Sequence, residues 1–127
     1  MQTKPKILLA EDDISLAFVI KDNLSDRGYD ITHCSNGLEA ERIIYKEKFD
    51  LYLLDVMMPG LDGKATFGKF KEIPSLAAIP VVFMTAKVLT HEIDFYLELG
   101  AAGVISKPFD PMTLAEEVQT IWAHSRV

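Results

Sequence analysis

The chain has 127 residues, 49% of them hydrophobic, and a formal net charge of -6. This length predicts one domain, residues 1–127, with a sizeable core, and the acidic balance gives no general attraction to nucleic acid or to an anionic membrane. Cys34 is the only cysteine, which excludes an internal disulfide, and no apolar run approaches the ~20 residues that a membrane-spanning helix needs. We expect a soluble, cytoplasmic protein.

Short apolar runs alternate along the chain with longer amphipathic stretches. The apolar runs predict strands at 6–11, 29–34, 50–55, 79–85 and 103–106. The amphipathic stretches predict helices at 15–28, 38–49, 64–72, 91–100 and 111–125, and the third of these is weak. Helix boundaries have their own signals: Asp13 and Asp110 at helix starts, Pro111 in a first turn and Gly100 at a helix end.

This alternation predicts an α/β fold, a flavodoxin-like, doubly wound parallel sheet of five strands in the order 2-1-3-4-5 with helices on both faces. Ligands of such sheets bind beyond the carboxyl ends of the strands, where the strand order reverses. The side chains at these ends should therefore converge at one edge of the sheet. They are Glu11, Asp12, Asp13, Asp55, Thr85, Ala86, Ser106 and Lys107.

Three of these side chains, Glu11, Asp12 and Asp55, are carboxylates that should lie close together. Like charges ~4 Å apart repel by ~4 kcal/mol at an effective dielectric constant of 20, so a cation is needed among them. An all-oxygen set suits Mg²⁺, and no His or Cys is placed to bind zinc. Lys107 adds a positive charge for an anionic oxygen, and Thr85 adds a hydroxyl donor. Together these groups predict a phosphoryl site with Asp55 as the nucleophile.

The segment LYLLDVMMPGLDG, residues 51–63, ends an apolar strand in an acid and then breaks. We expect the break at 57–60 to turn the backbone away from the strand end. This turn would leave Asp55 exposed and the backbone carbonyl of Met57 free to reach the metal.

The segments LLAEDD, LLDVMMPGLDG, VVFMTA and GAAGVISKPF together resemble the receiver domain of bacterial two-component response regulators, over essentially the whole chain. The resemblance implies that Asp55 accepts a phosphoryl group from a histidine kinase or a histidine phosphotransfer protein. It also implies that Asp12, Asp55 and the Met57 carbonyl bind Mg²⁺, while Glu11 acts through water.

Further roles come from the same resemblance. Thr85 and Lys107 would contact the phosphoryl group, and the bond between Lys107 and Pro108 would be cis. The protein would be a signalling switch that catalyses only its own phosphorylation and dephosphorylation, and would then bind an unknown downstream protein. A phosphorylation-linked dimer through the predicted elements at 91–100, 103–106 and 111–125 is a further expectation.

Val104 departs from the family, which commonly has Tyr or Phe three residues before the lysine. A valine has no ring to swing inward when Thr85 moves towards the phosphoryl group. We therefore expect phosphorylation to act mainly around Thr85, Ala86 and the loop that follows, and to change partner affinity only modestly.

Two other functions remain open. A magnesium-dependent phosphohydrolase would also use Asp55 as its nucleophile, but such enzymes commonly carry a second Asp shortly afterwards as general acid, where this chain has Met57. A flavin or nucleotide binder would be expected to carry a glycine-rich phosphate motif, and neither GxGxxG nor GxxxxGK[ST] occurs.

The remaining signals are weak. The three histidines, His33, His91 and His124, have no ligand-like partners and are interpreted as structural or surface residues. No linker or DNA-binding module is recognisable, which favours a stand-alone receiver without direct nucleic-acid contact, although a receiver excised from a longer regulator would have the same sequence.

Overall fold

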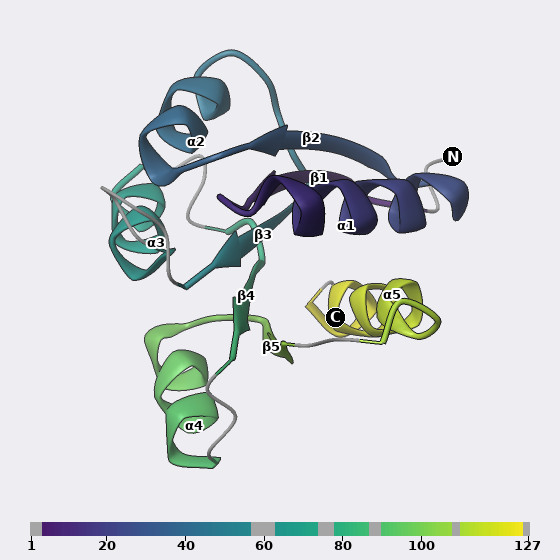
Figure 1. The fold of residues 1–127 in the computed structure, drawn as a ribbon. Helices are drawn as coiled ribbons and strands as arrows, with labels where there is room; N and C mark the ends of the chain where they lie inside the picture. Colours follow the sequence, from purple (N-terminus) through teal and green to yellow (C-terminus); the bar gives the residue numbers. More distant parts are fainter. Residues whose placement is uncertain (1–3, 57–62, 74–77, 87–89, 108–109, 126–127) are drawn as a thin grey trace.

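The structure is a computed structural model that describes residues 4–56, 63–73, 78–86, 90–107 and 110–125. Strands and helices alternate along the chain, and the strands form one parallel sheet in the order β2-β1-β3-β4-β5 (Figure 1). The predicted doubly wound α/β fold is confirmed. The elements are β1 Lys6–Ala10, α1 Ile14–Asp26, β2 Asp30–Cys34, α2 Gly37–Ile44, β3 Leu51–Asp55, α3 Gly63–Lys71, β4 Val81–Thr85, α4 Thr90–Leu99, β5 Gly103–Ser106 and α5 Leu114–Ser125.

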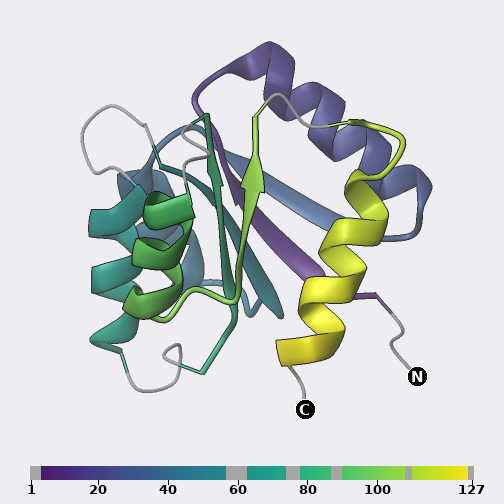
Figure 2. The ribbon, with the colours of Figure 1, turned by 90° about the horizontal axis from the view of Figure 1, so that it is seen from below.

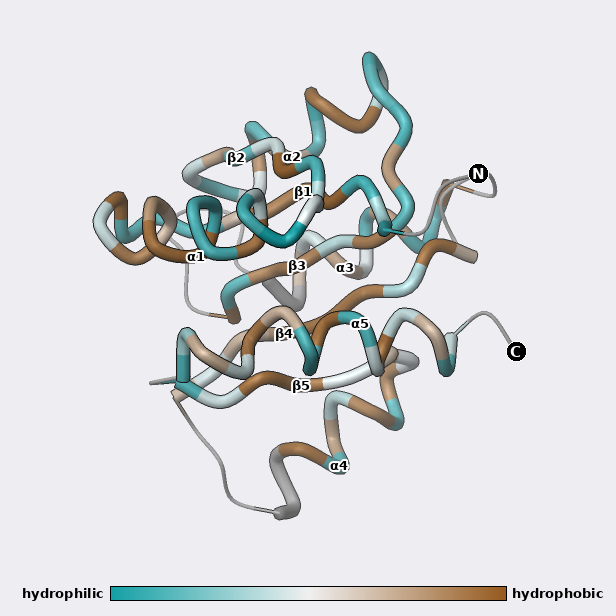
Figure 3. The backbone as a smooth tube through the Cα atoms, turned by 90° about the vertical axis from the view of Figure 1, so that its right-hand side faces the viewer, coloured by the Kyte–Doolittle hydropathy of each residue, from teal (hydrophilic) through white to brown (hydrophobic). Residues whose placement is uncertain are grey.

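Helices cover both faces of the sheet, α1 and α5 on one side and α2, α3 and α4 on the other (Figure 2). Successive strand residues face opposite cores, so that Ile7 packs with α1 and α5 while Leu8 packs with the other helices. Every residue of β3 and β4 is buried, because both faces of these strands are covered. Figure 3 shows the same strands coloured mostly towards the hydrophobic end.

Local signals in the sequence explain two of the helix boundaries. Asp13 caps α1 as predicted, because its side chain accepts a hydrogen bond from the backbone N–H of Leu16 at 3.1 Å. Gly100 ends α4 with a φ of 110°, a conformation that suits glycine, and its N–H donates to the carbonyl of Leu97. Within the described part of the chain, no helix is both long enough and apolar enough to cross a membrane.

Two predicted boundaries are wrong. The helix expected at 38–49 ends at Ile44, because the amides of residues 46 and 47 both turn back to the carbonyl of Ile43, which returns Phe49 to the core. The helix expected to begin at Pro111 begins at Leu114 instead.

Asp110 does hold the chain before α5, but it caps a preceding turn. Its side chain accepts from the N–H of Met112 at 2.9 Å, and its carbonyl accepts from the N–H of Leu114 at 3.1 Å. This side-chain bond is the local alternative to helix that Asp commonly offers, so the regular helix begins one turn later than predicted.

Candidate functional site

The carboxyl ends of the strands bring acidic and basic side chains together. Glu11 follows β1, Asp55 ends β3 and Lys107 follows β5. One carboxylate oxygen from each of Glu11, Asp12 and Asp55 lies within 4.8 Å of the other two; we call these three residues the acidic trio. The Nζ of Lys107 lies 2.7 Å from Oε1 of Glu11 and 3.1 Å from Oδ1 of Asp55. The predicted convergence at this edge is confirmed for these four side chains.

The three residues of the acidic trio differ in how far they are buried. Glu11 is 0% exposed and Asp55 is 4% exposed, whereas Asp12 lies in solvent. The expectation that Asp55 is exposed is therefore wrong. It ends a strand that is covered on both faces, and Glu11 and Lys107 lie beside its carboxylate.

Glu11 is fixed from several directions. Its Oε2 accepts from the N–H of Asp13 at 3.2 Å, and its own N–H donates to the carbonyl of Cys34 at 3.0 Å. The half-buried ring of His33 reaches the carbonyl of Glu11 with Nε2 at 2.8 Å, and because a carbonyl only accepts, this nitrogen donates. His33 is thus a structural residue, as expected, and it holds the backbone that carries the buried acid.

Electrostatics within the site follow from this burial. Burial first, and then the neighbouring carboxyl of Asp55, raise the pKa of Glu11, while Lys107 and the N–H of Asp13 lower it; the net result is a rise from 4.5 to about 7. Burial alone would lower the pKa of Lys107, but the ion pairs with Glu11 and Asp55 outweigh it, and the pKa lies above its ordinary value. The site therefore holds a tightly engaged ammonium beside an acid that readily takes a proton.

The strand ends β4 and β5 complete the edge. Thr85 is 3% exposed, and its carbonyl accepts from the N–H of Lys107 at 2.8 Å, which ties the lysine to the end of β4. Val104 is half-buried and packs with the core beneath α4. Met57 and Pro108, to which the sequence assigned a metal-binding carbonyl and a cis bond, lie outside the described residues.

The acidic trio fits a magnesium ion. It offers three oxygen donors in one small volume, and neither a histidine nor a cysteine belongs to it. Hard oxygen ligands with an exposed member that leaves room for water are what Mg²⁺ prefers, and the mutual repulsion of the carboxylates favours a cation among them. Among the described residues, Lys107 lies beside both Glu11 and Asp55, and its single positive charge is smaller than the charge of three ionised carboxylates.

An apolar flank beside the site was not predicted. Ile14 and Phe18 lie one turn apart on α1, just after Asp12, and are 65% and 69% exposed. The available signal was an excess of apolar positions in ISLAFVI, which is more than a single buried stripe requires.

Comparison with known proteins gives a consistent result. The family model of the response regulator receiver domain matches residues 7–119. The chain is 38% identical over 118 residues to the probable transcriptional regulator ycf29 of Pyropia yezoensis, which covers 93% of this chain and 53% of that protein. The chain spans about half the length of the curated relatives it matches.

Solved structures that share the fold include the receiver domains of two histidine kinases. The receiver domain of a signal transduction histidine kinase from Syntrophus aciditrophicus is 34% identical with a TM-score of 0.83, over 94% of this chain and 91% of that chain. The receiver domain of the sensor histidine kinase PA1611 from Pseudomonas aeruginosa PAO1, described with a magnesium ion coordinated in the active site cleft, is 27% identical with a TM-score of 0.83, over 94% and 98%.

Proposed function

The chain belongs to the response regulator receiver domain family, and on this basis we propose that it is a phosphorylation-dependent signalling switch in which Asp55 accepts a phosphoryl group. One observation carries the proposal: the buried carboxylate of Asp55 lies within the acidic trio and 3.1 Å from Lys107. Residues 1–127 then work as one receiver domain. It turns over no free metabolite, because the group that it takes up is bound to its own side chain.

In the proposed transfer, a carboxylate oxygen of Asp55 forms a bond to phosphorus while the bond from phosphorus to the donor breaks, and the electron pair leaves with the donor. Lys107 exchanges part of its contact with Glu11 for an oxygen of the incoming group, and the Thr85 hydroxyl donates to another.

Asp12, Asp55 and the Met57 carbonyl would hold Mg²⁺, with Glu11 acting through water. Bound Mg²⁺ would neutralise charge on the phosphoryl oxygens.

The proposed phosphodonor is a histidine kinase or a histidine phosphotransfer protein in the cytoplasm. Because Asp55 is only 4% exposed, a donor protein must contact the residues that surround Asp55 in order to reach it. The exposed Ile14 and Phe18 on α1 give such a donor an apolar surface beside Asp12. Phosphorylation would then change the affinity for a downstream protein.

The test is to incubate the protein with a small phosphodonor and then to measure the mass of the intact protein. We expect one phosphoryl group per wild-type chain with Mg²⁺, and none with a chelator or in Asp55→Asn. Stable labelling of Asp55→Asn would refute the assignment of the acceptor.

The same preparations separate the switch from a magnesium-dependent phosphohydrolase. A switch releases no more phosphate than its own phosphorylation supplies, whereas an enzyme converts many equivalents of a generic phosphomonoester. Sustained turnover of such an ester by wild type, lost in Asp55→Asn, would favour the enzyme.

A further inference from the structure

A groove of about 450 Å³ lies at the amino end of the sheet, beside the segment that joins α2 to β3. We call this site the amino-end groove. Its apolar lining residues are, from buried to exposed, Phe49, Ile44, Ile79 and Tyr45. The ring of Tyr45 is 68% exposed, so it adds little to the core and is available to a ligand.

The acids and the lysines that line the groove differ in whether they have partners. Both acids contact Lys6: Oε1 of Glu47 lies 3.2 Å from its Nζ, and Oδ2 of Asp50 accepts from its backbone N–H at 2.8 Å. Lys46 and Lys48 are exposed, and no ion pair among the described residues involves either of them. The groove therefore presents two ammonium groups beside its apolar lining.

Stabilisation of α2 does not account for these two lysines. Cations in the last turn of a helix interact favourably with the helix dipole, and Arg42 occupies that position in α2. The effect falls off within the last turn, whereas Lys46 and Lys48 follow the end of the helix.

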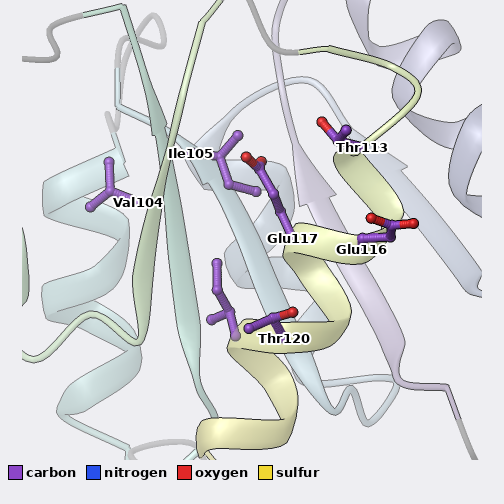
Figure 4. Close-up of a pocket in the computed structure, with 7 residues that line it drawn as sticks. Val104, Ile105, Thr113, Glu116, Glu117 and Thr120 are labelled. Atoms are coloured by element: carbon purple, nitrogen blue, oxygen red, sulfur yellow. The ribbon is translucent and has the colours of Figure 1, made fainter.

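Another groove, of about 400 Å³, lies between β5 and α5 and has the opposite charge. Figure 4 shows the carboxylates of Glu116 and Glu117 extending from α5, and no Lys or Arg is among the described residues that line this groove. An acidic ligand is therefore attracted to the amino-end groove and repelled by the groove beside α5.

We propose that the amino-end groove binds a segment of a partner protein in which Asp or Glu stands next to an aromatic or aliphatic side chain. The carboxylates of the segment meet the ammonium groups of Lys46 and Lys48, and its apolar side chain rests on Tyr45 and Phe49. The groove lies before β3 and Asp55 ends it, so the two are separated by a strand that spans ~13 Å. Binding therefore does not require phosphorylation of Asp55.

Two other ligand classes fit the groove less well. A nucleic acid brings a continuous row of phosphates, which would meet Glu47, Asp50 and a chain of net charge -6. A small molecule is held by polar groups in fixed positions, whereas Lys46 and Lys48 are exposed lysines on flexible stems.

A second copy of the chain offers similar chemistry on α4, where Asp94, Phe95 and Glu98 are all exposed. Such a contact joins two different surfaces, so it repeats from copy to copy unless the copies close into a ring. Association that grows with protein concentration would reveal this occupant.

The first test is a selection from a library of short random peptides against the wild-type protein. We expect enrichment of Asp and Glu next to aromatic and aliphatic residues, and a selected peptide should bind Lys46→Glu/Lys48→Glu about tenfold more weakly. Lys46→Gln/Lys48→Gln gives the same readout if the charge reversal unfolds the protein. Lys21→Glu/Arg27→Glu, at exposed residues of α1 and its cap, makes the same change in net charge and should bind as wild type.

The second test locates the selected peptide by amide NMR shifts in wild type and in Asp55→Asn. Shifts centred on residues 44–50 and on Ile79 in both proteins support the groove, whether or not Asp55 is the phosphorylation site. Four results would overturn the proposal: no enrichment of acidic residues, an equal loss of affinity in the α1 control, phenylacetate binding as tightly as the peptide, or shifts that follow protein concentration without peptide.

Discussion

A lysine forms an ion pair with a carboxylate at each end of the sheet, but the pair at the amino end is exposed and the pair at the carboxyl end is mostly buried. At the amino end, Nζ of Lys6 lies 3.2 Å from Glu47, and the two side chains are 29% and 44% exposed. At the carboxyl end, Nζ of Lys107 lies 2.7 Å from Glu11, with 19% and 1% exposed. Removing charges from water costs several kcal/mol per ion, so a buried pair stores electrostatic energy that an exposed pair does not. The buried pair lies directly beside Asp55, because Lys107 also contacts the Asp55 carboxylate.

The largest effect is expected from Lys107→Met, which keeps the aliphatic stem but removes the ammonium. Glu11 and Asp55 then face each other without their shared cation, and the unfolding free energy of the metal-free protein should fall by about 2 kcal/mol. Denaturant unfolding in the presence of a chelator measures it, and Mg²⁺ should restore part of the loss. A fall no larger than that of the same substitution at Lys6 would remove the distinction between the two ends.

The next effect is a pH dependence from Glu11. Its folded pKa, about 7, lies above the ordinary 4.5, so between these values the folded chain binds a proton that the unfolded chain has lost. Stability of the metal-free protein should therefore fall as pH rises from about 5 to 7, by on the order of 2 kcal/mol. Glu11→Gln should lack this slope. Parallel pH profiles for the two proteins would show that the buried acid does not titrate in this range.

The hydroxyl of Tyr52 tests whether burying an uncharged polar group without a hydrogen-bond partner lowers the stability of the protein. Tyr52 is 0% exposed, and its hydroxyl has no hydrogen-bond partner among the described residues. Tyr52→Phe should raise the unfolding free energy by about 1 kcal/mol. Tyr29→Phe is the matched control, because that hydroxyl bonds Ala115 and Gln119 at 3.1 Å, and it should lower stability. Equal changes in the two variants would contradict this explanation.

The smallest effect is expected from Lys6→Met. The exposed pair with Glu47 should contribute about 0.5 kcal/mol or less, and high salt should abolish even this difference. Methionine keeps an apolar stem but loses the cation–π contact of Nζ over the ring of Phe49, 5.3 Å from its centroid. A loss above about 1 kcal/mol that survives high salt would show that the amino end also depends on its ion pair.

Sequence patterns predicted what depends on local periodicity. The strands were recognisable because β3 and β4 are apolar throughout, and strand order followed from the crossover rules. The acidic trio followed from the position of Asp55 at a strand end.

What could not be predicted depends on contacts between distant segments or on local competition. Lys107 lies 96 residues from Glu11 in the chain, and nothing local shows that this acid, rather than Asp55, is its nearer partner. The burial of Asp55 arises from helices on both faces and not from its neighbours in sequence. The cap of α2 was not predicted, because Asn36, whose side chain accepts from the N–H of Glu39 at 2.9 Å, lies in an ordinary polar stretch.

Magnesium binding, followed by titration calorimetry, tests most directly whether the carboxyl end of the sheet is the functional end. Wild type should bind one Mg²⁺, Asp12→Ala should bind at least about tenfold more weakly, and Lys107→Met should keep its affinity because the lysine is not a ligand. Glu47→Ala, at the amino end, should bind as wild type. Undiminished binding by Asp12→Ala, or a loss in Lys107→Met as large as that in Asp12→Ala, would contradict a metal site built from the acidic trio.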